Sequence, residues 1–218
     1  MALFDGFAAV GKALANGRRA ELVDVLAQGE RSVEVLAGEV GQSVANTSQH
    51  LQVLSRAGLV QARRDGNRVL YRLAGDAVGE LWAAVRAVAS KHLAGLDQLA
   101  ADYLGDRSGM EELSRAELVR RLSDGVIVWD VRPPAEFEAG HVSGAVSVPP
   151  GEVRRRLRSV PKDAHVVAYC RGPYCVFADD AVRQLRAKGR QALRLEDGFP
   201  EWRRAGLPVA VGPERADP

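Results

Sequence analysis

The stretch from residue 166 to residue 189 most constrains the fold, because it has the pattern of a buried strand, a tight loop and a helix in direct succession. The strand is the apolar run that ends at Cys170, and the loop contains the turn Gly172-Pro173. Apolar residues at helical spacing follow, and Gly189 closes the helix. Cys170 is therefore predicted where a strand stops, and loop N–H groups together with the positive helix end there favour a thiolate.

Both cysteines of the chain lie in this loop, Cys170 at its start and Cys175 at its end. A single cysteine in an apolar run usually behaves as a small buried hydrophobe. Two cysteines in one short loop, with none elsewhere, instead favour reactive thiols. In a reducing compartment such a pair is expected to be chemically active rather than a structural bridge.

The length of 218 residues allows one large domain or two small ones, each with its own core. No apolar run approaches the about 18 residues of a membrane span, and residues 1–5 lack the basic start of a secretion signal. We therefore expect a cytoplasmic protein. The net charge of +2 is too small to indicate a nucleic-acid partner, but five arginines oppose the single acidic Asp65 between residues 55 and 75.

The first half of the chain predicts a mainly helical domain. Apolar spacing indicates two helices between about residues 5 and 27, broken near Asn16-Gly17, and a short third helix over residues 33–40. Ser43 is the predicted N-cap of a fourth helix that ends at Arg56. One face of this fourth helix is predicted to pack on the core: Val44, Thr47, Leu51 and Leu54.

This order of elements is that of a helix-turn-helix: a helix, a short glycine-containing turn, and a second helix whose outward side chains are small or carry amides. A helix-turn-helix presents that second, recognition helix to the major groove. Two alternating segments joined at residues 64–67 then predict a β-hairpin whose arginines contact phosphates. The alternative is a solvated basic hairpin on a helical domain. The predicted DNA contacts are Ser43, Ala45, Asn46, Ser48, Gln49, Gln52, Arg56, Arg63, Arg64, Asn67 and Arg68.

Residues 48–54, 57–60 and 64–73 resemble the winged helix-turn-helix of the ArsR family of bacterial repressors, and the resemblance covers about residues 5–103. It implies double-stranded operator DNA as a partner and repression that a ligand releases. It also implies a homodimer, with an interface formed by the first helix and by one long helix from about Asp76 to Tyr103.

Many members of that family sense metals, through cysteines on the helix before the recognition helix or through His and carboxylate pairs on the last helix. Residues 33–40 hold no cysteine, and His92, Asp97 and Asp102 do not share one helix face well. We therefore expect no metal site in this domain and a sensor elsewhere in the chain.

The second half of the chain predicts an α/β domain with a mostly parallel sheet. Ser114 and Glu117 fit a capping box, and residues 126–131 form the continuous apolar run of a strand covered on both faces. Further strands are predicted over residues 145–148, 166–169 and 192–195, alternating with helices. We predict a DNA-binding and dimerisation domain over residues 1–104, a polar linker over 105–110, and the α/β domain over 111–218.

Residues 130–145 and 195–209 resemble the first and last signatures of the rhodanese family of sulfurtransferases, over about residues 111–211. The resemblance places Cys170 at the position of the catalytic cysteine, which in the family carries a persulfide between donor and acceptor. Structural roles are predicted for four residues of these signatures, as loop-locking hydrogen-bond partners or, for the tryptophan, as core: Asp130, Arg132, His141 and Trp202.

In sulfur transfer the Cys170 thiolate would attack the outer sulfur of thiosulfate, a persulfide or a polysulfide, and a second thiolate would then attack the resulting persulfide. The loop amides of residues 171–176 are predicted to hold the terminal sulfur, and Arg171 to bind the donor's negative charge. Gly172 and Cys175 depart from the commoner family pattern and do not favour efficient turnover with thiosulfate.

Cys175 is interpreted as a resolving cysteine, which attacks a Cys170 persulfide to give a disulfide or a longer polysulfide bridge. The alternative is that Cys175 packs under the start of the helix. The predicted catalytic residues are Cys170, Arg171, Gly172 and Cys175.

The sequence thus predicts a cytoplasmic, dimeric transcriptional repressor whose rhodanese-like domain senses or processes reactive sulfur, with no cofactor. Two alternatives stay open: a working sulfurtransferase tethered to a DNA-binding domain, and a sensor in which both thiolates bind an arsenical or another thiophilic ion. A phosphatase or arsenate reductase with this fold would need an arginine six residues after the cysteine, where Val176 stands.

Overall fold

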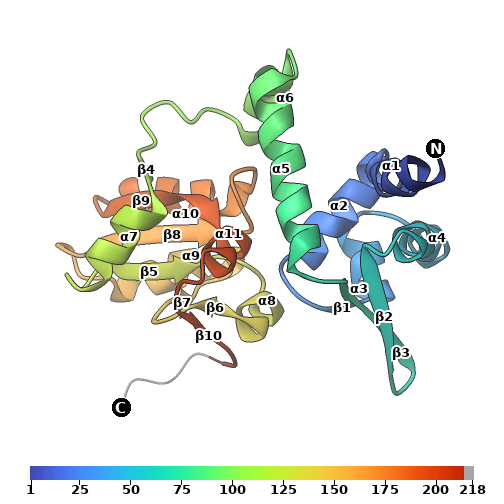
Figure 1. The fold of residues 1–218 in the computed structure, drawn as a ribbon. Helices are drawn as coiled ribbons and strands as arrows, with labels where there is room; N and C mark the ends of the chain where they lie inside the picture. Colours follow the sequence, from blue (N-terminus) through green and yellow to red (C-terminus); the bar gives the residue numbers. More distant parts are fainter. Residues whose placement is uncertain (214–218) are drawn as a thin grey trace. The chain divides into compact units, whose positions relative to one another are not determined.

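A computed structural model describes residues 1–213 and divides the chain into two compact units, Met1–Leu93 and the part from Ala94 onward (Figure 1). Each unit has its own buried core. The predicted fold class is confirmed: a mainly α winged helix-turn-helix is followed by an α/β unit with a parallel sheet. The division falls before α6, whereas the boundaries at residues 104 and 110 stay predictions.

The first unit begins with the two helices that the break at Asn16-Gly17 predicts, and the Asn16 side chain caps the second by accepting from the Arg19 N–H. Ser32 and Ser43 cap the next two helices in the same way. The elements are α1 (Ala2–Leu14), α2 (Gly17–Leu26), β1 (Arg31–Ser32), α3 (Val33–Glu39), α4 (Val44–Arg56), β2 (Val60–Asp65), β3 (Arg68–Leu73) and α5 (Asp76–His92).

The strands β2 and β3 form the predicted hairpin, with Asp65 opposite Arg68 and β1 added on the far side of β3. Gly66 turns the chain at a φ of 58°, a left-handed conformation that glycine adopts without strain. Leu51 and Leu54 of α4 are fully buried against α2 and the other helices, which fixes the opposite face of α4 toward solvent.

Two details of the predicted helices were wrong. Val44 does not pack on the core, because it opens the first turn of α4 and is 45% exposed. The long helix expected from Asp76 to Tyr103 is two helices, because Leu93 is extended and Gly95 has a left-handed φ of 82°, which together end α5 and start α6 (Leu96–Leu104).

The second unit then alternates strands and helices, and Ser114 caps α7 by accepting from the Glu117 N–H. Its strands are β4 (Glu112–Leu113), β5 (Ile127–Asp130), β6 (His141–Val142), β7 (Val146–Ser147), β8 (His165–Cys170), β9 (Gln191–Gly198) and β10 (Val209–Ala210). Its helices after α6 are α7 (Arg115–Leu122), α8 (Pro134–Ala139), η1 (Pro150–Glu152), α9 (Val153–Arg156), η2 (Leu157–Ser159), α10 (Val176–Arg186) and α11 (Phe199–Arg204).

The main sheet has the order β4-β9-β8-β5-β7 with every pairing parallel, and β6 and β10 form a separate antiparallel pair. Residues of β8 alternate between two cores: Ala168 and Cys170 pack with α9 and α10, whereas Val167 and Tyr169 pack with α7, α8 and α11. Both faces of the sheet are therefore covered, as the apolar strand sequences predict.

Within residues 1–213, no helix is both long enough and apolar enough to cross a lipid bilayer.

Candidate functional site

The cysteine loop joins the carboxyl end of β8 to the start of α10, as the sequence pattern predicts. Cys170 is the last residue of β8 and Cys175 is the N-cap of α10, and the two are joined by a disulfide with their Cα atoms 6.2 Å apart. The Cys175 N–H donates to the Gly172 carbonyl at 3.2 Å, which closes the loop into a tight turn. This structure therefore shows the pair in its oxidised, disulfide form, in which Cys170 is 1% exposed.

Gly198, at the end of β9, allows the backbone of the cysteine loop to pack directly against the sheet. A Cβ at position 198 would meet the Arg171 carbonyl carbon at 2.3 Å and the Gly172 nitrogen at 2.4 Å. Backbone atoms cannot move aside cheaply, so any side chain at this position would displace the loop. The last rhodanese-like signature thus contains a glycine because the backbone after Cys170 occupies its side-chain space.

One side of the loop is held by an ion pair from α8. The Arg171 guanidinium donates to both Glu136 carboxylate oxygens, with Nε to Oε1 at 2.9 Å, and the Glu136 side chain is fully buried. The positive charge of Arg171 is therefore matched within the protein. Its predicted role in binding a donor anion stays a prediction.

A second buried pair lies on the same side, below Glu136. Arg132 and Asp130 are both fully buried, and Arg132 Nη2 donates to Asp130 Oδ2 at 2.6 Å and to the Gly140 carbonyl at 2.7 Å. Tyr169 donates its hydroxyl proton to Asp130 Oδ2, and burial together with that carboxylate raises the pKa of Tyr169 well above its usual range. His141 stacks on Phe137 and bonds its carbonyl through Nδ1. Asp130, Arg132 and His141 thus fix backbone segments, as their loop-locking interpretation predicts.

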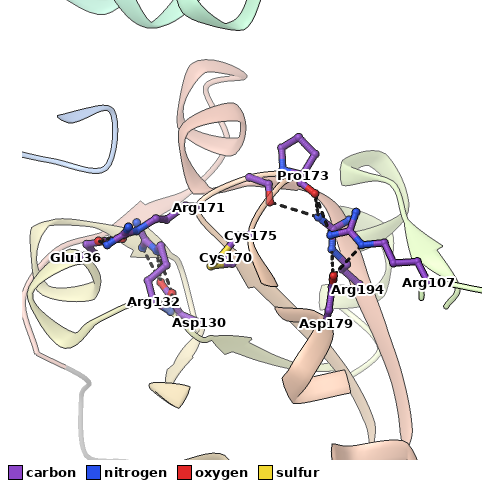
Figure 2. The surroundings of a disulfide bond; sticks show 11 residues. Arg107, Asp130, Arg132, Glu136, Cys170, Arg171, Pro173, Cys175, Asp179 and Arg194 are labelled. Atoms are coloured by element: carbon purple, nitrogen blue, oxygen red, sulfur yellow. Dashed lines mark hydrogen bonds and ion pairs between the residues drawn. A yellow bond between two sulfur atoms is a disulfide. The ribbon is translucent and has the colours of Figure 1, made fainter. Parts of the chain in front are cut away.

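The other side of the loop is held by two arginines that share one buried carboxylate, Asp179 of α10. Arg107 Nε donates to Asp179 Oδ2 at 2.7 Å, and Arg194 Nε lies 2.9 Å from Oδ1. Both arginines also donate to the Pro173 carbonyl, at 3.0 and 2.9 Å. Figure 2 shows the disulfide between this group and the group of Glu136, Arg171, Asp130 and Arg132.

Arg194 is 1% exposed and reaches the loop a second time, through the Gly172 carbonyl at 3.3 Å. Burial, followed by the like charge of Arg107, lowers the pKa of Arg194, while Asp179 and Glu112 act in the opposite direction. The carbonyl groups of residues 172 and 173 are therefore turned toward the arginines. This leaves Cys170 on a loop whose backbone is fixed from both sides.

The structure brings all four predicted catalytic residues into one loop, but it adds five that sequence reasoning did not assign to the site. Arg194 is flanked by Ala192, Leu193 and Leu195 in β9, and Asp179 lies on the apolar side of a helix. Charged residues at such positions are a usable signal. Arg107 carries no such signal, since it lies in a polar segment. The five residues are Arg107, Glu136, Asp179, Arg194 and Gly198.

The predicted DNA contacts form a second candidate surface, on α4 and the β2–β3 hairpin. Ten of the eleven are exposed and Ser48 is half-buried, as the face assignment of α4 predicts. Ser43 is occupied as the cap of α4, where it accepts from the Asn46 N–H at 3.2 Å. Contact with DNA at each of these residues stays a prediction.

The arginines of the hairpin differ from one another. Arg63 donates from Nε to Glu30 Oε1 at 2.8 Å, and this hydrogen bond raises the pKa of Arg63. Arg64 is exposed and has no side-chain partner in the described part of the chain. The two neighbours therefore present different net charge to a ligand, a difference that the sequence does not show.

Among residues 1–213, no group of three or more His, Cys, Asp or Glu side chains is arranged to hold a metal ion.

The fold and the cysteine loop together define a protein class: a winged helix-turn-helix joined to a rhodanese-like α/β unit. Family models agree with both halves. Residues 16–62 match the arsR family of bacterial regulatory proteins, and residues 114–205 match the rhodanese-like domain.

One relative matches nearly the whole length of the chain. The chain is 51% identical over 212 residues to the HTH-type transcriptional regulator Rv0324 of Mycobacterium tuberculosis, covering 97% of this chain and 93% of that protein. The chain therefore belongs to the ArsR-family transcriptional regulators that carry a C-terminal rhodanese-like domain.

Each half also has separate relatives. A sulfurtransferase of Allochromatium vinosum is 35% identical over 107 residues, covering 48% of this chain and 98% of that protein. The solution structure of the homodimeric winged helix-turn-helix DNA-binding domain of Mb0332 from Mycobacterium bovis is 53% identical, with a TM-score of 0.41, covering 42% of this chain and 85% of that one.

Proposed function

We propose that this regulator is a homodimeric, cytoplasmic repressor that senses reactive sulfur, as persulfide or polysulfide, through Cys170 and Cys175. The observation that carries the proposal is the pairing of the chain's two cysteines, one at the end of a buried strand and one at the start of α10. A thiol next to a resolving thiol is the usual arrangement of a redox sensor.

The chemistry begins with attack of the Cys170 thiolate on the outer sulfur of a persulfide RSSH, which leaves Cys170 as a persulfide and releases RSH. The Cys175 thiolate then attacks Cys170 Sγ, and the outer sulfur leaves as hydrogen sulfide. Overall, two thiols and RSSH give the disulfide, RSH and H₂S, so the donor takes the two electrons. A cellular dithiol that reduces the disulfide would reset the protein.

The DNA-binding half of the proposal rests on the exposed face of α4 and on the hairpin. Amide side chains such as Gln49 and Gln52 can bond base edges in the major groove, and arginines of the hairpin can contact phosphates. Binding to DNA also supports the cytoplasmic location, since bacterial operator DNA lies there.

The homodimer rests on apolar side chains that α1 and α5 leave exposed. Phe4 and Phe7 are 73% and 63% exposed, and Val85 and Val88 of α5 line a groove of about 570 Å³ with His92. Large apolar side chains gathered on two helices are typical of a protein interface. A second copy of the chain would cover them and would present two recognition helices to one operator.

An active sulfurtransferase is the second candidate, and the likeness to a sulfurtransferase of Allochromatium vinosum supports it. In that function the Cys170 persulfide passes its sulfur to an external thiol or to cyanide, and Cys175 is dispensable. Rapid steady-state turnover would favour the enzyme, whereas one sulfur transfer followed by disulfide closure would favour the sensor.

The test combines intact mass after polysulfide treatment with affinity for the protein's own promoter DNA at fixed salt. Reduced wild type is expected to gain sulfur or lose two hydrogens and to change its DNA affinity by about tenfold or more. Cys170→Ser should do neither, and Cys175→Ser should hold added sulfur without losing hydrogens. Sulfur uptake with unchanged DNA affinity would contradict the sensor and leave the sulfurtransferase.

A further inference from the structure

The segment that follows α6 is bound along α10, the helix whose N-cap residue is Cys175. Arg183 Nη2 donates to the Asp106 carbonyl at 3.0 Å, and Arg186 Nη1 donates to the Gly109 carbonyl at 2.7 Å. Both arginines belong to α10. Residues 104–109, which lead in the sequence toward the DNA-binding unit, are therefore held by the helix that directly follows the second cysteine.

Arg107 makes the reverse connection, from this segment into the cysteine loop. Its side chain is about three-quarters buried, and it bonds the fully buried Asp179 through Nε and the Pro173 carbonyl through Nη2. Pro173 lies between the two cysteines. Arg107 is thus the residue of the segment whose side chain touches both α10 and the loop, as Figure 2 shows.

We infer that Arg107 is a positioning residue that transmits the redox state of the Cys170–Cys175 pair to residues 104–110. The inference rests on the proposed function and names how its sensor would act on the rest of the chain. It concerns the side chain of Arg107 and not the thiol chemistry, which Cys170 and Cys175 perform.

The physical basis is the position of the Pro173 carbonyl. The disulfide holds the ends of the loop with Cα atoms 6.2 Å apart, and in this form the carbonyl accepts from both Arg107 and Arg194. Reduction adds two electrons and two protons and removes the covalent restraint, so the loop regains freedom at residues 171–174. Arg194 stays fixed in β9, whereas Arg107 lies on a segment without regular structure and can follow the loop.

The first experiment measures amide hydrogen exchange of the peptide spanning residues 104–110 in the full chain. The protein is compared as dithiol and as disulfide, the latter made with diamide, whose N=N bond takes up the two electrons and two protons. In wild type, exchange of this peptide is expected to be slower by about threefold or more in the disulfide form. Equal exchange in the two forms of wild type would overturn the inference.

Variants then separate transmission from simple anchoring. Arg107→Lys keeps a positive charge for Asp179 but cannot reach Asp179 and Pro173 with one planar group, so the difference between the two forms should vanish. Arg183→Gln is the matched control, because Arg183 holds the same segment without touching the loop. It should speed exchange in both forms and leave their difference in place. Equal loss of the difference in both variants would assign Arg107 a merely anchoring role.

DNA affinity distinguishes the failure of this inference from the failure of the proposed function. The inference holds if polysulfide changes the DNA affinity of wild type by about tenfold and that of Arg107→Lys by less than about twofold, while intact mass shows the disulfide in both proteins. If both respond alike, the sensor stands and the inference falls. If wild type takes up sulfur without any change in DNA affinity, the proposed sensor falls, and the exchange experiment still decides the role of Arg107 within its own unit.

Discussion

The recognition helix α4 presents its predicted contacts to solvent, whereas the cysteine loop is enclosed by charged groups that are themselves buried. Most polar residues on the outer face of α4 are exposed, and their geometry follows from the helix alone. Around the loop, by contrast, Asp130, Glu136 and Asp179 are fully buried, and each is paired with an arginine. Substitutions on the outer face of α4 should therefore leave the unit folded, whereas substitutions of the buried charged residues around the cysteine loop should destabilise it.

The largest effect is expected for Asp130→Asn. This change keeps the side-chain shape but leaves Arg132 buried beside a neutral group, which costs about 3–5 kcal/mol of the unfolding free energy of the second unit. The measurement is urea unfolding followed by the fluorescence of Trp129 and Trp202, both buried in that unit. Asp124→Asn, at an exposed position, is the control and should shift stability by less than about 0.5 kcal/mol. An unchanged transition for Asp130→Asn would show that the pair does not hold the loops.

The next effect is expected for Gly198→Ala, which tests whether the loop depends on close packing against β9. The added methyl would overlap the backbone of Arg171 and Gly172, so we expect about 1–3 kcal/mol of destabilisation and slower sulfur uptake at Cys170. Gly151→Ala is the matched control, because a Cβ there meets nothing within 4 Å and the backbone has no positive φ. Unimpaired sulfur uptake in Gly198→Ala would mean that the loop can shift without loss of reactivity.

The difference between the two regions also explains what the sequence could predict. Periodicity and capping residues place α4 from Val44 to Arg56, and the strand pattern places Cys170 at the end of β8, because these features depend on neighbours in the chain. The break at Gly95 was missed because one glycine within an apolar repeat is compatible with a continuous helix.

The partners around the loop come from distant segments. Arg107 and Asp179 are 72 residues apart, and Arg171 and Glu136 are 35 apart. No local pattern specifies such pairs, and the family resemblance marks Cys170 without saying which charges fix its loop. The position of the two cysteines at the end of a strand and the start of a helix was therefore predictable from the sequence, and the charged residues that surround them were not.

On the predicted DNA-contact surface, substitution of Ser43 is expected to have a smaller effect, with separate parts for stability and for DNA affinity. Ser43→Ala removes the cap of α4 and should cost about 1 kcal/mol of stability in the first unit. Ser43→Asp keeps a capping oxygen, so stability should be retained, but its negative charge should weaken DNA binding if the residue faces phosphate. Thermal unfolding and DNA affinity measured together separate these roles. Equal DNA affinity of Ser43→Asp and wild type would remove Ser43 from the predicted contacts.

The smallest effect is expected from a comparison of two adjacent hairpin arginines. Arg64 has no side-chain partner in the described part of the chain, so Arg64→Ala should remove one phosphate contact from each protomer. The slope of log affinity against log salt should then fall by roughly 0.9 per protomer, or about 1.8 for the proposed homodimer. Arg63 is already paired with Glu30, so Arg63→Ala should change the slope less. The single variant Glu30→Gln, which leaves Arg63 intact, should steepen the slope, because it frees the Arg63 charge. If Arg63→Ala and Arg64→Ala reduce the slope equally, the ion pair between Arg63 and Glu30 breaks when DNA binds. The hairpin surface would then have to rearrange to bind its ligand, unlike the cysteine loop, whose ion pairs are already formed.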